Sequence, residues 1–368
     1  MITTTSPAAT PAPAGAAPSA ALVAVRALRR RQGSLNLLLL ALLLATTTVA
    51  LGIGPVGVAP ADVLGILGHH LLGTRYDAGW TRTEDVIVWG TRAPRVAMAV
   101  VAGAALGVAG AVLQALVRNP LADPYLLGLN AGASAGAAVA VLVIGAGSAL
   151  ALSGSALIGA VGAIVLVMLL GGVAGQRGPL RLVLAGLAVG YALHAVTNFL
   201  LFWSDSPEAA RSVLFWLLGS LASVQPVMLL AATVATLLGT TALVLVAPVI
   251  DALGSGDDSA RSAGLHPEHA RFAVMAGTSA MVGVVVAAVG GVGFVGLVVP
   301  HLARRLVGGR HRAVVPASAL LGALVLVVAD TVARTALDPR EIPVGVVTGI
   351  VGAPLLLVLL RRSGAQSL

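Results

Sequence analysis

The feature that most constrains this chain is a set of long segments without any charged residue. The clearest one runs from Val96 to Val117, and its 22 residues are enough for one helix to cross a lipid bilayer. Arg92-Ala-Pro-Arg95 precedes this run, and Arg118-Asn-Pro-Leu-Ala-Asp-Pro124, a polar turn bracketed by prolines, follows it. The segment therefore predicts a membrane span with a different polar device at each end.

The composition agrees with a membrane protein. Hydrophobic residues make up 58% of the chain and charged residues only 10%, whereas soluble domains average about a quarter charged residues. The 45 glycines are typical of membrane helices that approach one another closely. No cysteine is present, so the chain forms no disulfide. The net charge of +8 comes from arginines that flank apolar runs, as membrane topology requires, so it does not indicate a nucleic-acid partner.

Counted against the roughly 20 residues that a span needs, the charge-free runs predict about ten transmembrane helices. The predicted fold is all-α and polytopic, with a transmembrane domain over residues 34–362 and a disordered cytoplasmic tail, rich in Ala, Pro and Thr, over residues 1–33. The apolar run after Arg31 is too long for a cleaved signal peptide, so the first span is expected to remain. The expected spans are 35–54, 96–117, two within 124–176 joined near Gly145-Ala-Gly147, 182–204, one within 212–250 after a short helix near 213–219, a full and a short span within 272–303 divided at Gly290-Gly-Val-Gly293, 313–329 and 342–360.

The distribution of arginines tests this count. If the first span starts in the cytoplasm, ten spans place both termini inside and fifteen of the 22 arginines on inside segments, in agreement with the positive-inside rule. Removing one span would place the Arg304–Arg312 cluster outside. An even number of spans near ten is therefore favoured.

Charges inside the predicted spans are almost absent, and Asp330 is the one candidate. A transporter driven by protons or sodium normally carries buried acids or a polar broken helix near the midplane, so energy is expected to enter from a partner. The chain also lacks Gly-x-Ser-Gly, His-Glu-x-x-His and the phosphate-binding Gly-x-x-x-x-Gly-Lys-Ser/Thr loop, so neither proteolysis nor its own ATP binding by that loop is indicated. We expect no enzymatic activity and no cofactor in this chain.

One inside loop, Asp251 to Arg271, is long and polar. Gly264 is expected to end a short helix, and Pro267 with Glu268 suits the first turn of the next one. Two hypotheses stay open: the loop is a solvated connector, or it forms a compact knob on which a soluble motor subunit docks.

Several motifs occur in order along the chain, and together they make it resemble the FecCD-type permeases, the membrane subunits of type II ABC importers for iron–siderophores, haem and vitamin B12. The resemblance covers residues 35–362. The motifs are Arg92-Ala-Pro-Arg95, Gly103–Gln114, Arg118–Pro124 with Leu127-Gly128, Leu184–Gly190, Phe215–Gly219, Gly293–His301, Ala329–Arg334 and Glu341–Gly349.

The resemblance implies a homodimer, or a pair of close paralogues, in a bacterial cell membrane, with two cytoplasmic ATP-binding subunits and an extracytoplasmic substrate-binding protein. It assigns docking of the binding protein to Arg92, Arg95 and Arg334; the alternative is that these arginines only anchor helices. It assigns coupling to the ATPase to Ala263-Gly264-Leu265 and Arg271. The chain departs from the family at Gly175–Arg181, where Ser and Thr are absent from the inner approach to the fifth span, so how that gate closes stays open.

The predicted cargo is a ferric siderophore, with cobalamin, haem or, in a different class, an ion-coupled substrate as alternatives. No metal site is expected at His69-His70 or at His266 and His269. His301 is expected to contact backbone. Asn119 and Asp123 are expected to hold their turn through bonds from side chain to backbone.

Overall fold

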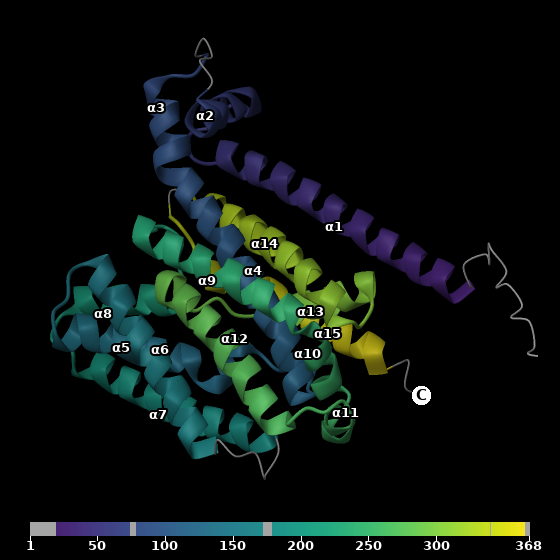
Figure 1. The fold of residues 1–368 in the computed structure, drawn as a ribbon. Coiled ribbons are helices and arrows are strands. Elements are labelled where there is room, and N and C mark those ends of the chain that lie inside the picture. The colour runs from purple at the N-terminus through teal and green to yellow at the C-terminus, as the bar shows by residue number, and fades with distance from the viewer. Residues whose placement is uncertain (1–19, 74–78, 172–178, 339, 365–368) are drawn as a thin grey trace, which may run out of the picture.

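The computed structural model describes residues 20–73, 79–171, 179–338 and 340–364, and within these it contains helices and no strand. Figure 1 shows a bundle of long helices, crossed at one side by α1, with the small helices α2 and α3 beyond one end. The helices are α1 Ala20–Gly52, α2 Pro60–Leu72, α3 Arg82–Asp85, η1 Val86–Arg92, α4 Ala93–Val117, η2 Pro124–Leu127, α5 Leu129–Ala138, η3 Val139–Val143, α6 Ala149–Gly171, α7 Pro179–Trp203, α8 Pro207–Leu217, α9 Pro226–Leu245, α10 Ala247–Gly254, α11 Asp257–Ser262, α12 Pro267–Val289, α13 Val295–Val307, α14 His311–Thr335 and α15 Val344–Gly364.

The all-α membrane fold predicted from the sequence is confirmed. Seven helices in the described residues are long and apolar enough to cross a membrane, and the shorter apolar helices Leu129–Val143 and Val344–Val358 join them. With the short helix α13, each of the ten expected spans corresponds to a helix. The turn expected near Gly145 lies between η3 and α6, as predicted.

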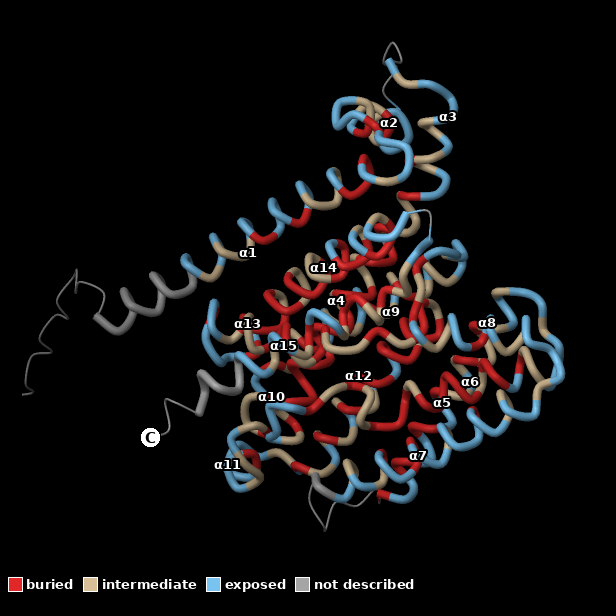
Figure 2. The backbone as a smooth tube through the Cα atoms, turned by 180° about the vertical axis from the view of Figure 1, so that it is seen from behind, coloured by how far each residue is buried: buried red, intermediate tan, exposed pale blue. Residues whose placement is uncertain are grey.

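Helix α4 is the centre of the bundle, and Figure 2 shows buried residues concentrated on it and on its neighbours. It packs along α14 and against α9, α12 and α13. Glycines permit the closest approaches, because a Cβ atom at Gly103 would collide with the backbone of Gly322, and one at Gly110 with the backbone of Gly296. Lipid provides no hydrophobic drive for helices to associate, so this close packing is what holds the core together.

The predicted break between α12 and α13 is present, and backbone groups that have no partner within a helix there bond to other parts of the protein. The Tyr125 hydroxyl donates to the Val292 carbonyl at 3.0 Å and accepts from the Val292 amide at 2.9 Å. The Ser220 amide donates to the Val289 carbonyl at 2.9 Å. Irregular backbone at membrane depth is tolerated only when its polar groups are satisfied in this way.

Two helices extend beyond their predicted limits. α1 starts at Ala20, so residues 20–33 belong to a helix and not to the expected tail; residues 1–19 lie outside the described residues. Ala, Leu and Arg in this stretch are strong helix formers. The helix expected from residue 96 starts at Arg82 and runs through η1 into α4, because Thr81 and Glu84 form a capping box that begins it.

Candidate functional sites at the two ends of the bundle

The predicted site residues gather at opposite ends of α4. The Arg95 end comprises the last turn of α1, the first turn of α4, the last turn of α14 and the loop before α15. The Arg118 end comprises the end of α4, helices α10 and α11, the start of α12 and the loop between α13 and α14.

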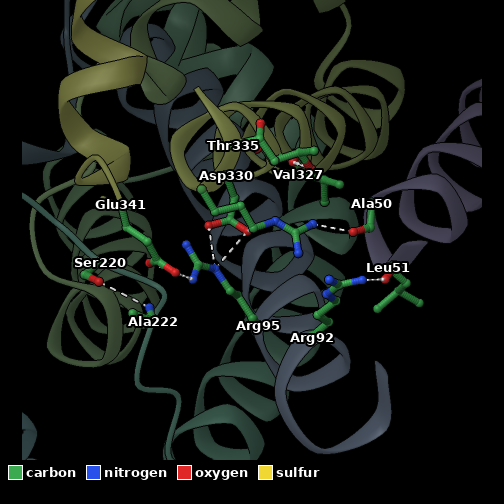
Figure 3. Close-up of polar contacts among 12 residues, drawn as sticks. Ala50, Leu51, Arg92, Arg95, Ser220, Ala222, Val327, Asp330, Thr335 and Glu341 are labelled. Carbon is green, nitrogen blue, oxygen red and sulfur yellow. Dashed lines mark hydrogen bonds and ion pairs between the residues drawn. The ribbon is translucent and has the colours of Figure 1, made fainter. Parts of the chain in front are cut away.

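At the Arg95 end, two arginines hold the C-terminus of α1 (Figure 3). Arg92 Nη1 donates to the carbonyl oxygens of Leu51 at 2.8 Å and Gly52 at 3.1 Å, and its Nη2 donates to Val56 at 2.6 Å. Arg334 donates to the Ala50 carbonyl. The last carbonyls of a helix have no partner inside the helix and carry partial negative charge, so buried guanidinium groups satisfy them well.

Arg95 lies beside this cap and binds two carboxylates. Its Nε is 3.0 and 3.1 Å from the two oxygens of Asp330, and its Nη1 is 3.0 and 2.8 Å from those of Glu341. The Asp330 side chain is 1% exposed, whereas that of Glu341 is 48% exposed. Asp330, the acid that the sequence places inside a span, is therefore neutralised by Arg95, with Arg334 Nε 3.9 Å away.

The structure brings Arg92, Arg95 and Arg334 together around one cavity of about 320 Å³. Arg92 and Arg334 are buried and hold α1, which is the geometry that the helix-anchoring alternative describes. Arg95 reaches the rim through its pair with the exposed Glu341. Docking of a binding protein here stays a prediction for all three residues.

At the Arg118 end, α4 closes in a Schellman motif without glycine. Arg118 adopts a left-handed conformation with φ of 54°, its amide donates to the Ala115 carbonyl, and the Asn119 amide donates to the Gln114 carbonyl. Asn119 Oδ1 accepts from the Leu121 amide at 2.9 Å and Asp123 Oδ1 from the Tyr125 amide at 2.8 Å. The predicted bonds from these two side chains to the turn are confirmed.

Gly264 terminates helix α11 as predicted, again in a Schellman motif, two residues after Ser262. Gly264 has φ of 78°, its amide donates to the Arg261 carbonyl, and the Leu265 amide donates to the Ala260 carbonyl at 3.0 Å. Pro267 then occupies the first turn of α12. The loop is thus one short helix and the first turn of a span, joined at Ala263-Gly264-Leu265, and its coupling role stays a prediction.

Arg271 is placed differently from a residue on an exposed knob, because its side chain is only 6% exposed. Its Nη2 donates to Asp257 Oδ1 at 2.6 Å and its Nε to the Leu116 carbonyl at 3.2 Å. Arg118 Nη2 donates to the same Asp257 oxygen at 2.9 Å. Asp257 therefore ties α11 to the end of α4 and to the start of α12; we name this arrangement the Asp257 clamp.

Sequence reasoning missed Asp257. The available signal was its place after Gly256 in the first turn of a short helix, where a negative charge is favourable. Nothing in the sequence indicated that Arg118, 139 residues away, would be its partner.

A cavity of about 560 Å³ lies beside the clamp, between α10, the turn after α4 and the loop before α14. Arg304 donates to Gln114 Oε1 at 2.6 Å, and His311 Nδ1 lies 2.6 Å from Asp251 Oδ1. The first bond fixes α13 to the end of α4, and the second fixes the start of α14 to α10. His301 Nε2 is 3.1 Å from the Pro120 carbonyl, so its predicted backbone contact is confirmed.

The two histidine pairs of the sequence make ring and ion-pair contacts. Within the described part of the chain, no group of three or more His, Asp or Glu side chains is arranged to hold a metal ion. His70 instead lies 2.9 Å from Asp85 and stacks on Trp89, and His266 packs edge-on against His269. The departure noted at Gly175–Arg181 falls largely on residues 172–178, outside the described residues.

Comparison with known proteins finds similar sequences over almost the whole chain. Residues 37–362 match the family described as the FecCD transport family. The chain is 35% identical over 317 residues to the Fe(3+)-citrate import system permease protein YfmE of Bacillus subtilis, covering 85% of this chain and 90% of that one. It is 37% identical to the vitamin B12 import system permease protein BtuC of Vibrio cholerae, with 78% and 86% covered. It is 36% identical to the hemin transport system permease protein HmuU of Yersinia pestis, with 78% and 87% covered.

A solved structure supports the same fold. A structure described as an inward-facing metal-chelate type ABC transporter superposes with a TM-score of 0.79 at 30% identity, covering 90% of this chain and 99% of that one. The long helices of this chain are thus arranged as in a type II ABC importer permease.

Proposed function

The chain belongs to the FecCD transport family and is a permease of the ABC importer type, and we propose that its cargo is a ferric siderophore. The relatives are named for iron citrate, vitamin B12 and hemin, three cargoes in which an organic framework surrounds a metal ion. Iron is named in YfmE and in two further relatives at 35–38% identity, which favours an iron chelate over cobalamin or haem as the cargo here.

The observation that carries the proposed energy source is the pair between Arg95 and Asp330. An ion-coupled transporter needs an acid in a span that can bind and release its ion. Asp330 is buried and its carboxylate is held by two bonds from Arg95, which argues against that function. Energy would instead enter from ATP-binding subunits, which agrees with the missing phosphate-binding loop.

We place the Arg118 end on the cytoplasmic side, with both termini, because the arginine distribution favours that orientation. The ATP-binding subunits would dock on α11 and the Ala263-Gly264-Leu265 turn. The Asp257 clamp would pass their movement to α4 and α12, since Asp257 binds an arginine from each.

The Arg95 end would then face the extracytoplasmic binding protein. An acidic residue of that protein would reach Arg95 by competing with the half-exposed Glu341. Exposed ion pairs contribute little individually, about 0–1 kcal/mol, so such contacts would set docking orientation and encounter rate more than affinity. A second copy or a close paralogue would complete the pathway.

Uptake by proteoliposomes tests this proposal. We expect a radiolabelled ferric siderophore to accumulate only when the ATP-binding subunits, ATP and a loaded binding protein are all present. Parallel assays with cobalamin and haem, each with its own binding protein, test the cargo separately from the energy source. Uptake driven by a proton or sodium gradient without the ATP-binding subunits would refute the importer mechanism.

A further inference from the structure

Helix α2 is apolar on two opposite sides. Val63 and Ile66 are fully buried on the side that faces the protein. On the other side Leu64, Leu71 and Leu72 are 58%, 68% and 78% exposed. The spacing i, i+7, i+8 places these three leucines on one face of the helix, so α2 presents a leucine face that no part of the described chain covers.

The position of α2 is fixed against the end of the span α1. The Val58 amide donates to the Gly52 carbonyl at 3.0 Å, which closes the turn after α1. A Cβ atom at Gly52 would lie 3.7 Å from the Val63 side chain, so the two helices touch. Figure 1 shows α2 directly beyond that end of α1. Since α1 has the length and composition of a span, α2 lies at the level of a membrane surface.

The polar groups of α2 are confined to its two ends. Asp62 lies in the first turn, and His69 and His70 lie in the last. His70 is turned toward the protein, where its ring stacks on Trp89 with centroids 4.4 Å apart and its Nε2 lies 2.9 Å from Asp85. The leucine face therefore carries no charge that a partner protein would complement.

Exposed apolar residues also lie on the part of the chain that leads to α2. Val49 near the end of α1 and Ile53 in the following turn are also exposed. An exposed patch of this kind marks a contact with lipid or protein. Because the leucine face lies beyond the end of a span and lacks charge, lipid is the occupant that it fits.

We propose that α2 is an interfacial helix that inserts Leu64, Leu71 and Leu72 among the lipid acyl chains at the Arg95 end. Helices of this kind lie in the plane of the interface with one apolar face buried. Through its contact with η1, α2 fixes the level of the helix that carries Arg92 and Arg95. This inference depends on membrane embedding and not on the cargo proposed above.

The absence of cysteine makes a direct test simple, because each introduced cysteine is the sole labelling site. The variants are Leu64→Cys and Leu71→Cys in the full-length chain, each labelled with a small fluorophore and reconstituted in phosphatidylcholine and phosphatidylglycerol vesicles. Leu42→Cys, on the exposed side of α1, is the lipid-facing control. Thr83→Cys, on the exposed polar turn of α3, is the water-facing control.

We expect lipids brominated near the glycerol end of the acyl chain to quench positions 64 and 71 several-fold more strongly than position 83. Lipids brominated near the methyl end should quench position 42 more strongly than positions 64 and 71, which places α2 at the interface. Iodide quenching equal to that at position 83, without bromolipid quenching, would overturn the proposal. Protection from both quenchers would indicate a protein on the leucine face and would overturn it as well.

Discussion

Replacing Asp257 with asparagine removes the charge of the clamp while keeping the shape of the side chain. Asp257 Oδ1 accepts from Arg118 and Arg271, and both bonds are charge-assisted. The Arg271 bond contributes about 1.5–3 kcal/mol because that guanidinium is buried, whereas the half-exposed Arg118 bond contributes about 0–1 kcal/mol. We expect the attachment of α11 to weaken by about 2–3 kcal/mol, which is roughly 30- to 150-fold in the local equilibrium.

The expected functional result is loss of coupling without loss of ATP hydrolysis. In proteoliposomes containing the complete importer, Asp257→Asn should lower the amount of cargo transported per ATP several-fold. Asp257→Glu should restore part of the ratio, because it returns the charge at a slightly different distance. Asp258→Asn is the matched control, since Asp258 lies on the same helix, is fully exposed and pairs only locally with Arg261.

Two results would refute this reasoning. An unchanged transport-to-hydrolysis ratio in folded Asp257→Asn importer would show that the clamp does not transmit movement. Equal losses of assembly, hydrolysis and transport would show that it only stabilises the fold. Thermal unfolding of the purified variant in detergent separates these two results, since a purely structural role lowers the melting temperature without changing the ratio in the surviving protein.

The clamp also predicts how coupling depends on pH. The hydrogen bond from Arg271 lowers the pKa of Asp257 below its ordinary value. A carboxyl group whose pKa is lowered by folding contributes stability above its unfolded pKa, near 4, and loses it as the pH falls through the folded value. The transport-to-hydrolysis ratio should therefore stay constant from about pH 8 to pH 5.

Two further predictions concern the Arg95 end and the core. Arg92→Gln should leave the last carbonyls of α1 without their buried partner, at a cost of about 2–3 kcal/mol, and should therefore speed amide hydrogen exchange in the last turn of α1. The control Arg82→Gln, at an exposed position, should not change that exchange. If Arg92→Gln leaves the exchange unchanged but weakens docking of the binding protein, the docking role is favoured instead. Gly110→Val should force α4 away from the Gly296 backbone, at a cost of about 3 kcal/mol or more, and should lower the melting temperature. The control Gly162→Val, at a position where a Cβ atom meets open space, should leave the melting temperature unchanged. Equal effects of the two substitutions would contradict the packing argument.

Much of the fold was predictable from the sequence because membrane spans depend on local composition. A run such as Val96–Val117 has to cross the bilayer as a helix, because lipid offers no hydrogen-bond partner to its backbone N–H and C=O groups. Helix ends set by local chemistry were equally predictable, as at Gly264 and Pro267. The start of α3 at Arg82 was missed, although the Thr81-x-x-Glu84 spacing that caps it is a local signal.

The contacts of the site residues were less predictable because their partners lie far apart in sequence. The resemblance to the FecCD-type permeases is what identified the three arginines at 92, 95 and 334. Whether they face a partner or hold α1 depends on residues far away in the sequence. Arg334 binds Ala50, 284 residues away, and Arg92 binds Leu51, 41 residues away. No local pattern in the sequence contains that information, and the same holds for Asp257 and Arg118.

Helix α4 gives the two ends of the bundle a common structural element. Arg95 lies in its first turn directly after Arg92, Arg118 caps its other end, and the helix is buried along most of its length. A helix packed this closely cannot bend locally without opening contacts such as that between Gly110 and Gly296. Movement of α11 that reaches α4 through Asp257 would therefore displace α4 as a unit. The residues at the Arg95 end would then move with it. The coupling that we propose requires such a rigid connection, and the buried glycine contacts of α4 are what would supply it.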